Sequence, residues 1–261
     1  MIFFNPAIDI NSTFVLISCQ KNPFPDVFEI MDDFTEIANC NDCTWSTACF
    51  RQKIPDESDF INRNKTQIRY NKGENICKEK AYASNILYLA DGLVKVYLES
   101  PENRHININI LKTSEFIGLS SLYGDNIHHY SAVALVDCTI CMINKENFQK
   151  ILLEHGQFAS DIIQWYCQRE KQLFGRIKSL GHKQMNGRLA DVLFYLCDES
   201  FDQKLLFSQL TRKDIADFAG ISTESAVRVL TEFKTEGIIE LDGKMIRILD
   251  PKKLFEISKY G

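Results

Sequence analysis

Between residues 66 and 143, hydrophobic and polar positions alternate in short segments that are separated by turn residues. Such alternation predicts antiparallel strands that form a sandwich or barrel. The segments Ile86–Ala90 and Leu93–Leu98 flank Asp91-Gly92, a dipeptide typical of tight turns, and we expect them to form a hairpin. Two further strands are predicted, one over 106–111 and a long one over 132–143.

From about Lys145 onward the hydrophobic period changes to that of a helix. A seam follows the spacing 3, 4, 3, 4 and 3, and its members are Ile163, Tyr166, Glu170, Leu173, Ile177 and Leu180. This narrow stripe, flanked by basic residues, favours a helix that pairs with a second copy in a homodimer. The alternative, a helix packed only on its own domain, needs a wider apolar stripe. Glu170 would oppose its own copy across a twofold axis and weaken the dimer.

Residues 210–230 are expected to form a helix, a tight turn and a second helix. Thr211 and Asp214 have the spacing of a capping box, and Ser222 is a good N-cap for the second helix. Gly220 is placed where the turn needs a positive φ. Residues 239–248 are predicted to form a hairpin through Asp242-Gly243, which is positioned as the wing of a winged helix.

In a helix-turn-helix the second helix enters the major groove of double-stranded DNA. Helical spacing directs four side chains outward as candidate base readers: Thr223, Glu224, Val227 and Arg228. Four others are candidate phosphate contacts: Arg212, Lys213, Ser222 and Ser225. The competing interpretation is that Glu224 and Arg228 form only an exposed i,i+4 ion pair. A dimer of such units is expected to bind a palindromic operator.

The charge of the chain changes this picture in one respect. The chain of 261 residues has 30 Lys and Arg against 35 Asp and Glu. Residues 180–261 contain 12 of the basic and 13 of the acidic residues, so the expected DNA-binding part is not positively charged overall. DNA affinity must therefore come from a local basic patch and from dimeric binding. Charged or amide residues interrupt every apolar run before the length of a membrane span, and no secretory signal is apparent. We therefore expect a cytoplasmic protein without a membrane partner.

The first thirty residues show no clear hydrophobic period, and Met31 would serve equally well as a start. We therefore expect that these thirty residues are not translated in the cell. The expected domains are an N-terminal extension (1–39), a cysteine loop with a sensor domain (40–144), a dimerisation helix region (145–181) and a DNA-binding domain (182–261).

Nine cysteines, an odd number in a chain without a secretory signal, indicate free thiols or metal ligands. Cys40, Cys43 and Cys49 lie within one short polar loop, which suits a zinc ion or an iron-sulfur cluster equally well. Ordinary buried cysteines are the alternative. The fourth ligand is expected from Cys138 or Cys141, which point to opposite faces of a strand. We choose Cys141, because its neighbours on that face, Asp137 and Thr139, make it the more polar side.

Residues 40–250 resemble the CRP/FNR superfamily of bacterial transcription regulators, and in particular its oxygen-sensing FNR branch. The resemblance is carried by Tyr70-x-Lys-Gly-Glu-x-Ile, Leu87-Tyr-Leu-Ala-Asp-Gly-Leu-Val-Lys-Val, Glu115-Phe-Ile-Gly and the three-cysteine loop followed by Cys141. It implies an α+β protein with a cupin-like or jelly-roll-like antiparallel β-roll, a long dimerisation helix and a C-terminal winged helix-turn-helix. It also implies a 4Fe-4S cluster on Cys40, Cys43, Cys49 and Cys141. Oxygen would destroy this cluster, weaken the dimer and release the DNA. RNA polymerase is the expected protein partner.

The sequence departs from the family pattern at three places. Tyr130-Ser131-Ala132 replaces the Arg-Ser-Ala that holds a cyclic phosphate, and Leu119 replaces the usual acid, so no cyclic nucleotide is expected. Val227 replaces a serine of the reading helix, and its methyl groups suit a thymine methyl.

Other functions remain as alternatives on the sequence alone. They are a regulator that senses nitric oxide or haem through His128-His129, a structural zinc site, and an iron-sulfur electron carrier. We do not expect an enzyme, because no motif combines a nucleophile, a base and an orienting group.

Overall fold

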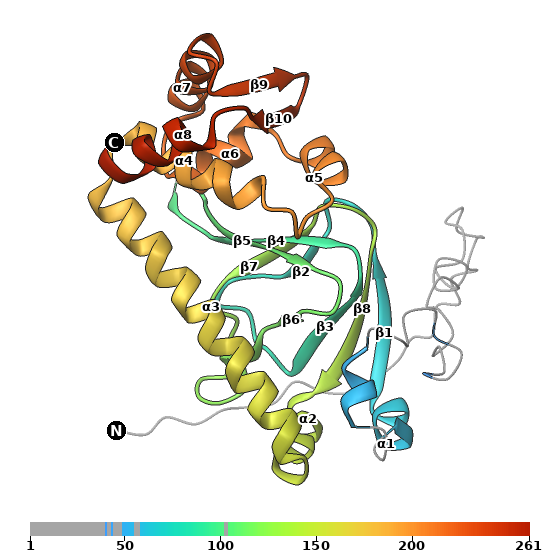
Figure 1. Cartoon of the computed structure of the whole chain (residues 1–261). Coiled ribbons are helices and arrows are strands. Elements are labelled where there is room, and N and C mark those ends of the chain that lie inside the picture. The colour runs from blue at the N-terminus through green and yellow to red at the C-terminus, as the bar shows by residue number, and fades with distance from the viewer. Residues whose placement is uncertain (1–39, 41–42, 44–48, 55–57, 102–103) are drawn as a thin grey trace, which may run out of the picture. The chain divides into compact units, whose positions relative to one another are not determined.

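The computed structural model describes residues 40, 43, 49–54, 58–101 and 104–261, which all belong to one compact unit. The predicted extension, residues 1–39, and the proposed start at Met31 lie outside the described residues. The described residues form two four-stranded antiparallel sheets, a long helix, and a helical head with a two-stranded wing (Figure 1). The predicted α+β fold, with a β-roll followed by a long helix and a winged helix-turn-helix, is confirmed.

The two large sheets make up the β-roll. The first contains, in spatial order, β1 (Lys65–Tyr70), β8 (Cys138–Asn144), β3 (Asn85–Asp91) and β6 (Phe116–Ile117). The second contains β2 (Asn75–Cys77), β7 (Ser131–Ala134), β4 (Leu93–Leu98) and β5 (Ile106–Lys112). Side chains from both sheets, among them Leu89, Val94 and Ile140, are buried in one shared core. A short 3-10 helix, η5 (Leu119–Ser121), follows β6.

The predicted hairpin through Asp91-Gly92 is wrong. β3 pairs with β8 and β6, whereas β4 pairs with β5 and β7, so the turn carries the chain from one sheet to the other. Gly92 has φ +117°, and a Cβ atom there would lie 2.5 Å from Cys138 Sγ. The turn residues were identified correctly, but a sheet-to-sheet corner has the same local sequence signal as a hairpin. The packing of distant strands decides between the two.

The single long strand predicted for 132–143 is also wrong, because it is divided into β7 and β8, which lie in different sheets. Residues 135–137 form the bend between them, and the backbone N–H of Leu135 donates to the carbonyl of Leu93 (2.8 Å). Cys138 and Cys141 do belong to different hydrophobic clusters, as the strand argument required. Cys141 and Thr139 on this face are nevertheless both buried, so the face is not open to solvent at these two residues.

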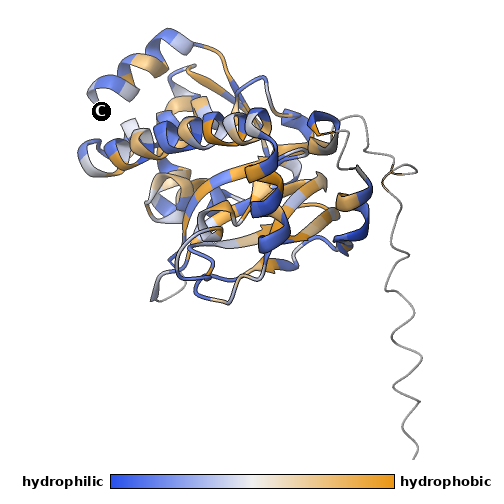
Figure 2. Cartoon of the chain, turned by 90° about the horizontal axis from the view of Figure 1, so that it is seen from below, coloured by the Kyte–Doolittle hydropathy of each residue, from blue (hydrophilic) through white to orange (hydrophobic). Residues whose placement is uncertain are grey.

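Phe50, which follows the cysteine loop, and Phe158 of the long helix belong to one hydrophobic cluster. This region contains η2 (Phe50–Lys53), α1 (Ser58–Arg63), α2 (Lys145–Glu154) and the beginning of α3 (Gly156–His182). Asn144 caps α2 by accepting from the backbone N–H of Glu146. The helices show hydrophobic and hydrophilic residues side by side along their length (Figure 2). In α3, one side buries Phe158 and Ser179, while several hydrophobic residues of the other side are exposed.

The hydrophobic core of the head also includes Leu93, Ile110 and Leu135 of the β-roll. The elements of the head are α4 (Met185–Leu196), α5 (Gln203–Gln209), α6 (Arg212–Ala219), α7 (Thr223–Thr235), β9 (Ile239–Asp242), β10 (Met245–Ile248) and α8 (Pro251–Tyr260). Leu193, Phe218 and Leu230 are fully buried or nearly so. β9 and β10 pair antiparallel across Asp242 and Met245, which confirms the predicted wing.

Candidate functional site

The helix-turn-helix is built by the local signals that the sequence carries. Thr211 and Asp214 form a complete capping box at the start of α6, and the Ser222 side chain accepts from the backbone N–H of Ser225 at the start of α7. Gly220 ends α6 in the left-handed conformation with φ +61°. These predictions are confirmed. The two caps and Gly220 fix the angle between α6 and α7, because the turn between these helices has only a few residues.

The side of α7 that contacts the head core differs sharply from its outer side. Ala226, Val229 and Leu230 are buried. Of the four predicted base readers, Glu224, Val227 and Arg228 are exposed and Thr223 is half-buried. The structure therefore presents the predicted residues together on the outside of the helix, near its N-terminal end.

Glu224 and Arg228 do not pair with each other, contrary to the competing interpretation. Arg228 Nη1 lies 3.9 Å from Glu232 Oε1, one turn further along the helix. The backbone N–H of Glu224 itself and the hydroxyl of Ser222 lower the pKa of the Glu224 carboxyl. Both side chains are exposed, so contact with DNA requires little desolvation of buried groups.

The predicted phosphate contacts have structural partners in the head. Arg212 Nη2 donates to the carbonyl of Gly243 in the wing turn (2.9 Å), and Lys213 Nζ pairs with Asp217 Oδ2 (2.7 Å). Ser222 and Ser225 bond each other through their hydroxyl groups (3.1 Å). Sequence reasoning missed Lys244, a wing residue whose Nζ donates to the carbonyl of Ser208 (2.9 Å). The sequence did carry a signal for this residue, because Lys244 is a basic residue directly after the predicted wing turn Asp242-Gly243.

The four predicted metal ligands line one small cavity. Cys40 and Cys141 are buried, and Cys43 and Cys49 are half-buried. The space between them measures about 10 Å³. Among the described residues, no group of three histidine, cysteine or acidic side chains is arranged to hold a single metal ion. The structure thus gathers the four thiols around one space.

Two residues of β1 face the thiol of Cys141. Gln67 lies opposite Cys141 in the strand register, and its amide donates to Cys141 Sγ (3.7 Å). Lys65 is buried and lines the cavity. Burial, the largest influence, raises the pKa of the Cys141 thiol to about 12. Lys65 opposes this rise, and the neighbouring thiols add to it.

The chemistry of this donor set fits an iron-sulfur cluster or a zinc ion, because four sulfur atoms and, among the described residues, no carboxylate line the cavity. The remaining cysteines that the structure describes are free thiols elsewhere: Cys77, Cys138, Cys167 and Cys197. Cys138 Sγ donates to the carbonyl of Val136 (3.1 Å) in the core of the roll. Cys19 lies outside the described residues.

The position at which an arginine was expected for a cyclic phosphate holds Tyr130. Its hydroxyl accepts from the backbone N–H of Gly118 (2.7 Å), so this N–H already has a partner. Leu119 is buried beside it. Desolvation upon burial raises the pKa of Tyr130 far above its ordinary value, and the phenol stays neutral. At position 130 a phosphate would therefore meet a neutral hydroxyl group, and Arg169, which lines the same cavity, already pairs with Glu115.

The adjacent histidines have different surroundings. His128 is buried, and burial lowers its pKa. His129 is half exposed and lies 3.4 Å from Asp125.

The predicted dimer seam lies on α3. Ile163, Tyr166 and Leu173 have exposed fractions of 63%, 47% and 43%, and Ile177 has 58%. Glu170 is also exposed. Leu180 differs, because it is half-buried and contacts the turn at Gly220. Arg169, the residue before Glu170, pairs with Glu115 of the roll.

Comparison with known proteins identifies both halves of the molecule. Residues 67–155 match the family model for a cyclic nucleotide-binding domain, and residues 187–257 match that for a Crp-like helix-turn-helix domain. Together the two models cover more than half of the chain. The chain belongs to the CRP/FNR family of transcription regulators.

Relatives from this family align over most of their length. The anaerobic regulatory protein of Bacillus subtilis (strain 168) is 23% identical over 74% of this chain and 87% of its own. The nitrogen fixation regulation protein FixK of Bradyrhizobium diazoefficiens is 22% identical over 82% of this chain and 92% of its own. The solved structure of FixK2 from Bradyrhizobium japonicum is similar in fold, with a TM-score of 0.63 and 21% identity over 74% of this chain and 96% of that one.

These relatives are named as regulators, and a CRP/FNR regulator binds DNA as a dimer. Among the described residues, no helix is long and apolar enough to cross a membrane. Membership of the family does not by itself determine which effector this chain responds to.

Proposed function

We propose that this chain is a dimeric cytoplasmic regulator whose DNA binding is controlled by a 4Fe-4S cluster on Cys40, Cys43, Cys49 and Cys141, in response to oxygen. In this proposal the cysteine loop and β-roll (40–144) sense the signal. The region 145–181 dimerises, and residues 182–261 read a palindromic operator and contact RNA polymerase. The observation that carries the proposal is the cavity lined by the four thiols.

The thiols come from two distant parts of the chain, three from one loop and the fourth from β8. The N–H of Gln67 and the ammonium group of Lys65 lie next to Cys141 and favour a negatively charged sulfur. A bound cluster of this kind supplies iron that oxygen can oxidise. The chain contributes soft ligands, a donor to one of them, and an apolar wall that includes Tyr88 and Ile143.

A direct connection leads from the cysteines to the dimer helix. Phe50 follows Cys49 and packs on Tyr88, Phe116 and Phe158, the last of which belongs to α3. Lys53 Nζ lies 2.5 Å from Asp161 Oδ2, also in α3. Because Cys49 and Phe50 are consecutive, displacement of the Cys49 thiol is expected to change the packing of α3 at its N-terminal end. We infer that this contact links the state of the cysteine site to dimerisation.

One relative is an anaerobic regulatory protein, and this supports a response to oxygen. The main alternative is a structural zinc site on the same four thiols. The test is to purify the protein without oxygen, record its visible absorption, and measure iron, sulfide and zinc. We expect a brown protein with about four irons per chain. A colourless protein with one zinc would contradict the cluster while leaving DNA binding intact.

Two cysteines of β8 provide a matched pair of variants. Cys141→Ala removes a proposed ligand. Cys138→Ala removes a buried thiol three residues away, which belongs to a different hydrophobic cluster. We expect Cys141→Ala to abolish iron binding and Cys138→Ala to retain it. Both variants lose a buried sulfur, so thermal unfolding of the two metal-free proteins reports whether stability alone separates them.

DNA binding is measured with the same preparations, before and after exposure to air. The proposal expects the protein and Cys138→Ala to bind a selected palindrome only before exposure, and Cys141→Ala to bind it weakly in both conditions. Equal binding by all three proteins in both conditions would contradict control by the cysteine site.

A further inference from the structure

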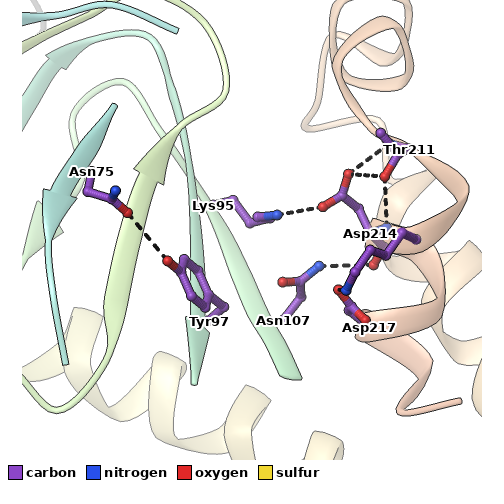
Figure 3. Close-up of polar contacts among 8 residues, drawn as sticks. Asn75, Lys95, Tyr97, Asn107, Thr211, Asp214 and Asp217 are labelled. Atoms are coloured by element: carbon purple, nitrogen blue, oxygen red, sulfur yellow. Dashed lines mark hydrogen bonds and ion pairs between the residues drawn. The ribbon is translucent and has the colours of Figure 1, made fainter. Parts of the chain in front are cut away.

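A polar joint between the β-roll and the head centres on Asp214 (Figure 3). One carboxylate oxygen of Asp214 accepts from the backbone N–H and the hydroxyl of Thr211 (2.8 and 2.6 Å), which completes the capping box of α6. The other oxygen lies 2.5 Å from Lys95 Nζ of β4. A residue that caps a head helix is thus also the partner of a lysine from the roll, 119 positions earlier in the chain.

Two more contacts hold the same helix. Asn107 of β5 is fully buried, and its Nδ2 donates to the carbonyl of Asp214 (2.9 Å). Arg176 of α3 donates to the carbonyls of Asn107 (2.8 Å) and of Phe218 (2.5 Å). Helix α6 is therefore attached near its N-terminal end to the roll and near its C-terminal end to the dimer helix. Two attachment points define the direction of a helix of only eight residues.

The Lys95–Asp214 pair is largely shielded from water, with side-chain exposures of 17% and 12%. Shielded pairs are screened less by salt than exposed ones. The capping bonds of Asp214 to Thr211 do not depend on Lys95. Removal of the lysine amine is consequently expected to remove the contact between α6 and β4 and to loosen the attachment of α6 to the roll, without unfolding the helix itself.

The position of α6 determines the position of the reading helix. Ala216 of α6 and Ala226 of α7 are both buried at 0% exposure, and the turn at Gly220 connects the two helices. With the joint closed, the face of α7 that contains Glu224, Val227 and Arg228 is exposed. A joint that inhibited DNA binding by occlusion would cover this face, and the described residues leave it uncovered.

We propose that Lys95 and Asn107 are positioning residues that orient each reading helix relative to the dimer helix, so that a dimer binds two half-sites at one fixed spacing. Half-sites of a palindrome lie one helical turn of DNA or a multiple of it apart. A head that is not held in one orientation still binds a single half-site. It loses the gain in affinity that comes when the second head of the dimer is already placed at the second half-site. The inference depends on dimeric DNA binding by this chain and not on the nature of its metal group.

The experiment uses the full chain, purified without oxygen, and duplexes that the parent protein selects from a random library. Three duplexes are compared: the full palindrome, a palindrome with the spacing increased by one base pair, and a single half-site. The variant is Lys95→Met, with Lys95→Arg as the conservative replacement. Lys78→Met is the matched control, because Lys78 pairs with Glu99 in the same domain, with exposures of 52% and 38%.

For Lys95→Met we expect about a tenfold loss of affinity for the full palindrome. We also expect unchanged affinity for the half-site and weaker discrimination between the two spacings. Lys95→Arg should retain most of the parent behaviour, and Lys78→Met all of it. Asp214→Asn keeps a capping oxygen but removes the charge, so it should add no further loss to Lys95→Met.

Three results would overturn the proposal. Unchanged spacing discrimination would mean that the joint does not orient the head, and tighter binding would mean that it inhibits. An equal loss on the palindrome and on the half-site would assign to Lys95 a role in the stability of the head alone. Thermal unfolding of each variant accompanies the binding measurements.

Discussion

The ring of Phe50, the residue after Cys49, stacks on the ring of Phe158 in α3, with centroids 5.8 Å apart and 28° between the ring planes. Both rings are buried, and both belong to the hydrophobic cluster that contains Cys40 and Cys141. The cysteine site and the start of α3 therefore share one core. In a close-packed core a shift on one side is felt on the other.

Replacing Phe50 by alanine is expected to destabilise the protein by about 3–5 kcal/mol, because it leaves a cavity between β3, β6 and α3. Tyr123→Ala is the control, since Tyr123 is an aromatic residue of the same domain with 66% exposure. Its effect should stay within about 0.5 kcal/mol. Denaturant unfolding measures both. Similar losses for the two variants would show that Phe50 is not part of a tightly packed core.

Gly220→Ala and Gly175→Ala should change stability in opposite directions. Gly220 has φ +61°, and an added Cβ would lie 2.9 Å from Leu180 Cδ2, so we expect a loss of at least about 1–2 kcal/mol. Gly175 lies within α3 with open space around it, and alanine there should add about 0.5–1 kcal/mol through helix propensity. Thermal unfolding of the two variants tests the signs.

Glu170→Leu is expected to strengthen the dimer, because it removes a like-charge contact across the predicted axis. Arg169 does not neutralise this charge, since it pairs with Glu115. Gln168→Leu adds the same apolar group at an exposed position outside the seam. Sedimentation of both variants after exposure to air provides the measurement. If Glu170→Leu dissociates as readily as the parent protein, the repulsion does not limit dimerisation.

Protein stability should fall as the pH decreases below about 6.5, the ordinary pKa of histidine. Burial lowers the pKa of His128, and Lys145 adds to this effect. The unfolded chain therefore binds a proton at a higher pH than the native protein does. The contribution of neutral His128 to the free energy of unfolding is fully present above pH 6.5. It is lost as the pH falls from 6.5 to the pKa of His128 in the native protein. The measurement is the free energy of unfolding at pH 7 and at pH 5. The parent protein and His182→Gln, a control at an exposed histidine, should both lose stability at pH 5, and His128→Gln should lose less.

Val227→Ser should change the base preference at one position of each half-site. Val227 is 45% exposed on the outer face of α7, and a hydroxyl group in place of its methyl groups exchanges an apolar contact for a hydrogen bond. A change of about 1–3 kcal/mol between two bases is expected at that position. Selection of binding sites from a random library, performed in parallel for the two proteins, identifies the position. Identical selected sites would exclude Val227 as a base reader.

The sequence by itself determined those features that depend on residues close together in the chain. The capping box of Thr211 and Asp214, the left-handed Gly220 and the cap at Ser222 are each formed by a few consecutive residues, and all three were predicted correctly. The alternation of β5 and the spacing of the α3 seam are likewise local patterns. The resemblance to CRP/FNR regulators rests on short motifs of the same kind.

Tertiary structure alone decided which strands pair and which distant side chains meet. The Asp91-Gly92 turn and the 132–143 segment were assigned wrongly, because sheet pairing depends on burial against strands elsewhere in the chain. The joint of Lys95, Asn107 and Arg176 with α6 had no signal in the sequence, since each contact spans at least 42 residues. A buried charge is stable only beside a partner, and the partner of Lys95 is Asp214, 119 positions along the chain. Only the fold brings the two together, so the sequence around Lys95 did not reveal its role.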